Sequence, residues 1–267
     1  MGGPCIGGKQ VTEDYWNLKG KRVLLTGASK GLGRVCAEAF EQAGAELLLC
    51  ARSADRLQTI VESFGEPAKH DVFAGDLRDP EQVGVLAERA GEFGPIDVVL
   101  HVMGGGLGMS KPLLEWGEFD ALFTTNLASA AELNRLLVPA MIDRGRGNVV
   151  HVGSIAGREA TGSVGYNSVK AALAAYIRSL GRELADTGVI VTGISPGGFW
   201  APENSWHRFK DRDPELLAQV IAERQPRKKL GDASEIVPVM LFLASDQATM
   251  MAGCSVPIDG GEGVTYQ

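Results

Sequence analysis

The chain has 267 residues, 45% of them hydrophobic, which predicts a folded globular domain and argues against intrinsic disorder. Lys and Arg number 26 against 33 Asp and Glu, so the formal net charge of −7 gives no overall attraction to nucleic acid or anionic lipid. No apolar stretch reaches the ~20 residues needed to span a bilayer, so we expect neither a nucleic-acid nor a membrane partner.

Short apolar runs alternate with longer helical patterns along the chain. Nearly continuous apolar runs are typical of strands covered on both faces, so the alternation predicts an α/β fold, a doubly wound parallel sheet in one domain. In chain order, the expected strands are residues 22–26, 46–50, a weaker one near 69–74, 97–102, 148–152, 189–194 and 254–258. The expected helices are residues 32–43, 55–64, 80–92, 119–144, 164–187 and 234–244.

The start of the chain and its cysteines indicate its surroundings. Residues 1–18 are Gly-rich and lack the pattern of a signal peptide, so we expect a loose N-terminal extension before a domain over 19–267. Cys36 and Cys50 lie in apolar runs, which favours buried free thiols. The four cysteines have no disulfide or metal-site spacing, so we expect no metal and a cytoplasmic location.

Two insertions interrupt the alternation, at residues 104–116 and 198–227. Both follow predicted strands, and ligands of such sheets bind outside the carboxyl ends of the strands. We therefore expect residues 198–227 to form a lid over a substrate.

A glycine-rich turn, T-G-A-S-K-G-L-G at 26–33, joins the first strand to the first helix. Glycines permit a tight turn and let backbone N–H groups approach a pyrophosphate at the positive end of a helix. The strand before and the helix after favour dinucleotide binding over a merely Gly-rich turn. The predicted contacts are Gly27, Ser29, Lys30, Gly31, Leu32 and Gly33.

The end of the second strand distinguishes NAD(H) from NADP(H). A carboxylate there would bind the ribose 2′-hydroxyl, but this chain has Arg52 and Ser53 instead. The Arg52 guanidinium matches a phosphate, and Lys30 adds a second positive charge. The sequence favours NADP(H); the alternative is that Arg52 is a solvated surface residue.

Tyr166 and Lys170 lie four residues apart in a helical pattern, on one face. An ammonium beside a phenol stabilises the phenolate, so the pair can protonate a carbonyl as a hydride arrives, or do the reverse. Ser154, after the fifth strand, can hold the substrate oxygen. Asn126 lies within a helical pattern, where a surface amide is an equally ordinary interpretation.

These residues resemble the short-chain dehydrogenase/reductase superfamily over residues 18–261. The matching motifs occur in the family's order: T-G-A-S-K-G-L-G at 26–33, G-D-L at 75–77, T-N-L-A-S at 125–129, G-S-I-A-G at 153–157, Y-N-S-V-K at 166–170, S-P-G at 195–197 and I-D-G-G at 258–261. The resemblance implies the Rossmann-like strand order 3-2-1-4-5-6-7. It also implies a homo-oligomer, a dimer or a tetramer built on the two long helices.

By this resemblance, each catalytic residue has a role. Tyr166 would be the general acid/base, and Lys170 would lower its pKa and hold the nicotinamide ribose. Ser154 would orient the carbonyl and Asn126 would hold a water in the proton relay. The remaining implied cofactor contacts are Asp76 and Leu77 beside the adenine, and Pro196 and Gly197 beside the nicotinamide. The four-residue Tyr-to-Lys spacing excludes the related enoyl reductases, which use a wider one.

The sequence departs from the family pattern at two cofactor corners. The usual N-N-A-G reads H-V-M-G at 101–104, and G-F-W-A at 198–201 replaces a Thr that often touches the carboxamide. We expect His101, Gly104 and Phe199 to contact the cofactor, because they occupy the corresponding positions of the family pattern. We expect His101, His151 and His207 to be structural or lid residues rather than catalytic bases.

The substrate is expected to be a small polar or anionic carbonyl compound or alcohol. Arg224, Arg227, Lys228 and Lys229 form a basic cluster in an acidic chain, which favours an anion site. The chain also resembles both 3-oxoacyl-carrier-protein reductases and surface-sugar or flagellin-modification oxidoreductases, so a 3-oxoacyl thioester and a keto-sugar nucleotide stay open. The alternative function is an NADP(H)-binding sensor or scaffold without turnover.

Overall fold

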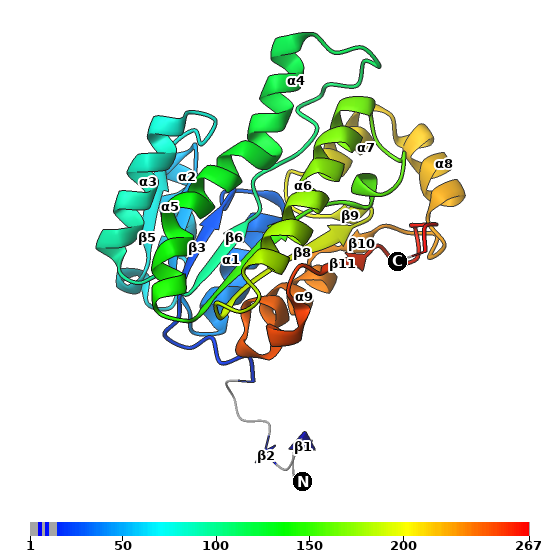
Figure 1. Cartoon of the computed structure of the whole chain (residues 1–267). Coiled ribbons are helices and arrows are strands. Elements are labelled where there is room, and N and C mark those ends of the chain that lie inside the picture. The colour runs from blue at the N-terminus through cyan, green and yellow to red at the C-terminus, as the bar shows by residue number, and fades with distance from the viewer. Residues whose placement is uncertain (1–4, 7–8, 11–14, 267) are drawn as a thin grey trace.

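A seven-stranded parallel sheet forms the centre of the molecule in the computed structural model, which describes residues 5–6, 9–10 and 15–266 (Figure 1). Its order, β5-β4-β3-β6-β7-β8-β11, is the predicted 3-2-1-4-5-6-7, so the predicted fold class is confirmed. The strands are β3 (Arg22–Thr26), β4 (Glu46–Ala51), β5 (Asp71–Ala74), β6 (Val98–His101), β7 (Gly147–Val152), β8 (Val189–Pro196) and β11 (Ser255–Ile258).

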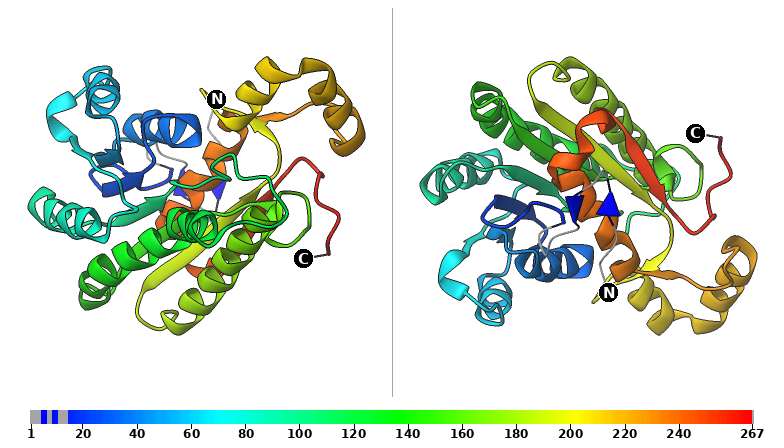
Figure 2. Two further views of the ribbon diagram at one scale, coloured as in Figure 1. Left: turned by 90° about the horizontal axis from the view of Figure 1, so that it is seen from above. Right: turned by 90° about the horizontal axis from the view of Figure 1, so that it is seen from below.

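Helices cover both faces of this sheet (Figure 2). The neighbours Leu24 and Leu25 of β3 are both fully buried, yet they belong to separate cores on opposite faces. This is why the strand is apolar throughout rather than alternating. One core is shared with α1 (Gly31–Gln42), α2 (Ala54–Glu62) and α9 (Ala233–Ala244), the other with α3 (Pro80–Phe93), α5 (Ser129–Asp143) and α6 (Val164–Glu183).

The single helix predicted over 119–144 is three segments. They are α4 (Trp116–Phe123), the π-helical segment η2 (Thr124–Ala128) and α5. Ser129 Oγ donates to the carbonyl oxygen of Thr124, five residues earlier, at 2.8 Å. Hydrophobic periodicity averages over many residues, so one widened turn leaves no clear signal in the sequence.

The insertion at 198–227 contains two helices that the sequence analysis did not predict. They are α7 (Ser205–Arg212) and α8 (Pro214–Arg224), flanked by the parallel pair β9 (Phe199–Trp200) and β10 (Gly231–Asp232). Asn204 and Asp213 cap the two helices through their side chains, and Pro214 is the first residue of α8. The Asn cap and the Asp-Pro pair are start signals that were available in the sequence.

The remaining elements are short. Three 3₁₀ turns, η1 (Pro67–Lys69), η3 (Ile155–Gly157) and η4 (Asp246–Met251), and the pair β1 (Cys5–Ile6) and β2 (Lys9–Gln10) complete the described elements. Trp16 packs against Phe242 of α9, and Leu18 is fully buried, so the last residues of the expected extension belong to the packed domain. Residues 1–4, 7–8 and 11–14 of that extension lie outside the described part of the chain.

Cys36 and Cys50 are buried free thiols, as predicted, and burial raises the pKa of both to about 12. Among the helices of the described ranges, none combines the length and the apolar character that crossing a bilayer demands. The cytoplasmic location stays a prediction.

Candidate active site

The predicted site residues gather at the carboxyl edge of the sheet. Because all seven strands run parallel, the segments that follow them emerge on the same side. This brings together residues that lie far apart in the sequence, from the glycine turn after β3 to the end of β8. The edge divides into a glycine-turn side and a side that carries Tyr166.

The glycine turn has no room for a side chain at two of its glycines, Gly27 and Gly33. A Cβ on Gly27, whose φ is +73°, would lie 2.9 Å from the backbone nitrogen of Met103. A Cβ on Gly33 would lie 2.2 Å from the carbonyl oxygen of Gly27. Lys30 is at the N-cap of α1 but makes no side-chain capping bond to it. The turn therefore presents backbone N–H groups at a helix start, which suits a pyrophosphate.

The loops after β4 and β5 carry the charged groups of this side. Ser53 Oγ accepts from the backbone nitrogen of Arg56 at 3.4 Å and caps α2. The pKa of Asp76 is lowered, chiefly by its hydrogen bond with Arg78 and also by the nearby charge of Arg52. Arg52 therefore lies close to the ends of both strands. Leu77 is buried beside them.

Asn126 holds the loop that follows β6. Its side-chain nitrogen donates to the carbonyl oxygens of Gly105 at 3.0 Å and Leu122 at 2.9 Å, and its oxygen accepts from Gly105 nitrogen at 3.0 Å. A Cβ on Gly104 would lie 3.0 Å from that same oxygen and 3.3 Å from Lys170 Nζ. The 3% exposure of Asn126 rules out the surface-amide alternative.

Lys170 and Tyr166 lie together in the first turns of α6. Lys170 is 3% exposed, and its ammonium donates to the carbonyl oxygen of Val152 at 2.8 Å and lies 5.7 Å from the centre of the Tyr166 ring. Burial lowers the pKa of Lys170 to about 8. Ser154 caps the turn after β7 and forms a side-chain hydrogen bond with Tyr166.

The pKa of Tyr166 is raised, by burial, and the hydrogen bond with Ser154 opposes that rise. The resemblance implied the opposite direction, a pKa lowered by Lys170. The physical reason is desolvation, which disfavours the charged forms of both the phenol and the ammonium.

His101 turns into the core. Its ring stacks on that of His151 at 4.5 Å, and its Nε2 lies 2.8 Å from the side-chain oxygen of Asn134 on α5. The Asn134 side-chain nitrogen donates to Tyr176 on α6 at 3.1 Å. The Nε2 atom of His101 therefore faces α5, and a contact of His101 with the cofactor stays a prediction. His207 lies in α7.

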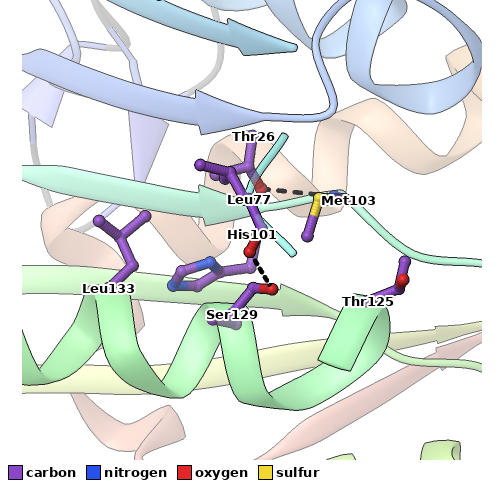
Figure 3. Close-up of a pocket in the computed structure, with 8 residues that line it drawn as sticks. Thr26, Leu77, His101, Met103, Thr125, Ser129 and Leu133 are labelled. Carbon is purple, nitrogen blue, oxygen red and sulfur yellow. Dashed lines mark hydrogen bonds between the residues drawn. The ribbon is translucent and has the colours of Figure 1, made fainter. Parts of the chain in front are cut away.

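Thr26 holds the strand corner in place of residue 101. Its hydroxyl donates to the carbonyl oxygen of Leu100 and accepts from the backbone nitrogen of Met103, both at 3.4 Å. A cavity of about 10 Å³ remains beside these residues (Figure 3), about the size of one water molecule. Its lining also includes Leu77, His101 and Thr125.

The nicotinamide-side residues predicted from the sequence lie at the end of β8. Gly197 nitrogen donates to the carbonyl oxygen of Ile258 at 3.2 Å, just after Pro196, and Phe199 is half-buried. Glu262, near the C-terminus, accepts from Gly198 nitrogen at 2.7 Å. Glu262 was not among the site residues predicted from the sequence.

Two of the four residues of the basic cluster, Arg224 and Arg227, have acidic partners. Arg224 pairs with Glu262 at 3.5 Å and Arg227 pairs with Glu235 at 2.8 Å. Arg224 also donates to the carbonyl oxygen of Thr161, in the loop between Ser154 and Tyr166. The cluster therefore ties the insertion to the catalytic side and offers less free positive charge than its sequence suggests.

The chain is similar to known reductases over almost its whole length. A family model described as enoyl-(acyl carrier protein) reductase matches residues 27–262. The 3-oxoacyl-[acyl-carrier-protein] reductase of Escherichia coli K12 is 32% identical over 250 residues, covering 92% of this chain and 98% of that protein.

Solved structures of reductases are also similar to this chain. A 3-oxoacyl (acyl-carrier-protein) reductase from Agrobacterium tumefaciens with NADP bound has a TM-score of 0.86 at 26% identity, covering 93% of this chain and 96% of that one. L-Sorbose reductase from Gluconobacter frateurii, complexed with NADPH and L-sorbose, has a TM-score of 0.85 at 30% identity, covering 93% and 98%. The fold, the motifs and these likenesses establish that the chain is an oxidoreductase of the short-chain dehydrogenase/reductase superfamily.

Proposed function

We propose that the protein uses NADP(H) to reduce a carbonyl group or to oxidise the corresponding secondary alcohol. The observation that carries the proposal is the cluster of Tyr166, Ser154 and Lys170, joined by a hydrogen bond and a close ammonium–ring contact. It lies at the same edge of the sheet as the glycine turn. One group for proton transfer beside one site for a dinucleotide is what hydride transfer to a carbonyl requires.

The residues of the site suit a dinucleotide with a 2′-phosphate. In the glycine turn, backbone atoms occupy the space that a side chain at Gly27 or Gly33 would need. The start of α1 has no side-chain cap. Arg52 and Lys30 supply positive charge on the ribose side, and Asp76, an acidic residue near Arg52, is bound by Arg78. Both named NADP(H) complexes among the similar structures support the same form of the cofactor.

Each catalytic side chain then has a defined task. NADPH, when bound, supplies the hydride to the carbonyl carbon. Tyr166 donates its phenolic proton to the carbonyl oxygen, and the Ser154 hydroxyl orients that oxygen. Lys170, held by the carbonyl of Val152, stabilises the phenolate left on Tyr166. Asn126 fixes the Gly105 backbone in the neighbouring loop.

The insertion at 198–227 is proposed to be the substrate lid. Within it, the Trp206 and Phe209 rings stack at 6.2 Å, and the Lys210 ammonium lies 6.0 Å from the Trp200 ring. Aromatic surface with adjacent positive charge suits a polar or anionic substrate such as a 3-oxoacyl thioester or a keto-sugar nucleotide. The similar proteins include acyl-carrier-protein reductases and a sorbose reductase, which supports keeping both classes.

The test is NADPH consumption across simple ketones, 3-oxoacyl thioesters, keto-sugar nucleotides and an enoyl thioester. We expect turnover of one carbonyl class, with NADPH favoured over NADH. Faster turnover with NADH would contradict the assignment of Arg52 and Lys30. Reduction of the enoyl thioester alone would replace carbonyl reduction by double-bond reduction, the activity in the family model's description. Tight NADPH binding with no turnover in either direction would favour a sensor.

We also propose a homo-oligomer formed through α4 and α6. Trp116, Phe119 and Phe123 are exposed at helical spacing on α4, which projects from the body of the molecule (Figure 1). Val164 is exposed on α6, which contacts α4. Sedimentation equilibrium is expected to give a dimer or tetramer, and Trp116→Lys is expected to shift it towards monomer. A wild-type monomer would contradict the proposal.

A further inference from the structure

A carboxylate from the insertion reaches the glycine-turn side of the site. The Glu203 carboxylate accepts two hydrogen bonds from one guanidinium nitrogen of Arg56, both at 2.9 Å. Arg56 is in the first turn of α2, three residues after Ser53. The charges of Arg56, Lys30 and Arg34 contribute to lowering the pKa of Glu203, after the leading effect of the Arg56 hydrogen bond. Arg56 at the start of α2 thus binds this carboxylate, and the charges of Lys30 and Arg34 at the start of α1 also act on it.

The backbone around Glu203 is bound to the same side. Pro202 carbonyl oxygen accepts from the backbone nitrogen of Gly31 at 2.7 Å, inside the glycine turn. Arg208 donates to the carbonyl oxygen of Glu203 at 2.8 Å. Glu203 has a φ of +57°, a left-handed conformation that is unfavourable for a residue with a side chain. These contacts hold an unfavourable backbone conformation in residues 202–203, the part of the insertion that contacts the glycine turn and is called the connector below.

A carboxylate surrounded by cations occupies the electrostatic position of a phosphate. We propose that Glu203 is a specificity-determining residue of the cofactor site: in the free protein its carboxylate holds Arg56, and a 2′-phosphate must displace it. The inference rests on the proposed NADP(H) function. Displacement releases Arg56 to the phosphate and frees the Gly31 N–H, so binding and opening of this connector are coupled. The connector lies between β9 and α7, so cofactor occupancy is communicated to the rest of the insertion.

The test compares adenosine 2′,5′-bisphosphate with adenosine 5′-phosphate, which differ only in the 2′-phosphate, by titration calorimetry. The Glu203→Gln variant keeps the shape and loses the charge. We expect it to bind the bisphosphate about three- to fivefold more tightly, the range of an exposed ion pair. Binding of adenosine 5′-phosphate is expected to stay within about twofold.

Two further variants test whether the change in bisphosphate affinity is specific to the Glu203–Arg56 pair. Glu215→Gln removes one charge from the same insertion, in the first turn of α8, and is expected to leave both affinities within about twofold. Arg56→Gln is expected to weaken bisphosphate binding and to abolish the gain from Glu203→Gln in the double variant. An equal gain in Glu215→Gln would reveal only a general charge effect and overturn the proposal.

Binding by the wild-type protein distinguishes an error in the NADP(H) assignment from an error in the role of Glu203. If the wild-type protein binds the bisphosphate no more tightly than adenosine 5′-phosphate, the NADP(H) assignment itself is wrong. If the wild-type protein prefers the bisphosphate but Glu203→Gln leaves that preference unchanged or smaller, only the role of Glu203 is wrong.

Discussion

Replacing Tyr166 by phenylalanine is expected to lower kcat for carbonyl reduction by about two to four orders of magnitude, the contribution of a positioned general acid. The ring remains to pack beside Lys170, and only the hydroxyl that bonds Ser154 is lost. NADPH binding, followed by fluorescence titration, is expected to change by less than about twofold because the glycine turn is untouched. Stopped-flow absorbance of NADPH measures the loss of the hydride-transfer step.

The control for this variant is Tyr176→Phe, on the same helix. The Tyr176 hydroxyl accepts a hydrogen bond from Asn134 in the core, away from the Ser154–Tyr166 contact. Its loss is expected to cost stability of about 1 kcal/mol and to leave kcat within about threefold. A Tyr166→Phe protein that retains kcat within about tenfold of the wild type would show that another group donates the proton.

Acid is expected to destabilise the protein well before its carboxylates are protonated. Burial lowers the pKa of His101 to about 4, and that of His151 also falls, chiefly through burial. The unfolded chain binds these protons near pH ~6.5 while the folded protein resists them, so stability falls as the pH drops below that value. His101 alone is expected to remove about 3 kcal/mol between pH ~6.5 and pH ~4. Urea unfolding at several pH values measures this loss.

The His101→Asn variant separates the buried pair from other titrating groups. The readout is the slope of the unfolding free energy against pH, and not the stability of the variant at neutral pH. In the variant this slope is expected to be shallower by about 1.4 kcal/mol per pH unit between pH ~6.5 and pH ~4. His70, whose pKa is also lowered by burial, keeps its share in both proteins. Equal slopes in wild type and His101→Asn would contradict the buried-proton account.

The sheet could be predicted because each strand carries its own signal. The predicted bounds of β3 match the structure at both ends, since Arg22 and the glycine turn delimit a short apolar run. Lys69 was placed near the third strand but ends a 3₁₀ turn, because the Pro67 that starts this turn lies just before a weakly apolar run. Strong local patterns were interpreted correctly, and a weak one was off by two residues.

The site was predicted in part because its motifs specify residues but not their partners. The sequence indicated that Tyr166 and Lys170 share a helix face, which α6 confirms. It gave no sign that Gly105 would bind Asn126, or that His101 would stack on His151 across two strands. Such contacts depend on the three-dimensional arrangement of loops and sheet register, and hydrophobic periodicity contains no information about them.

The widened turn at η2 has a consequence for which changes in length the chain can tolerate. Asn126 binds the loop after β6, while Asn134 on α5 binds the buried histidine pair. Each residue added to or removed from a helix rotates everything after it by about 100°, so a single-residue deletion between them would turn one amide away from its partner. The number of residues between these two asparagines is thus as constrained as their identities. Homologous sequences should accept insertions in the preceding loop, at 104–116, far more readily than in this stretch.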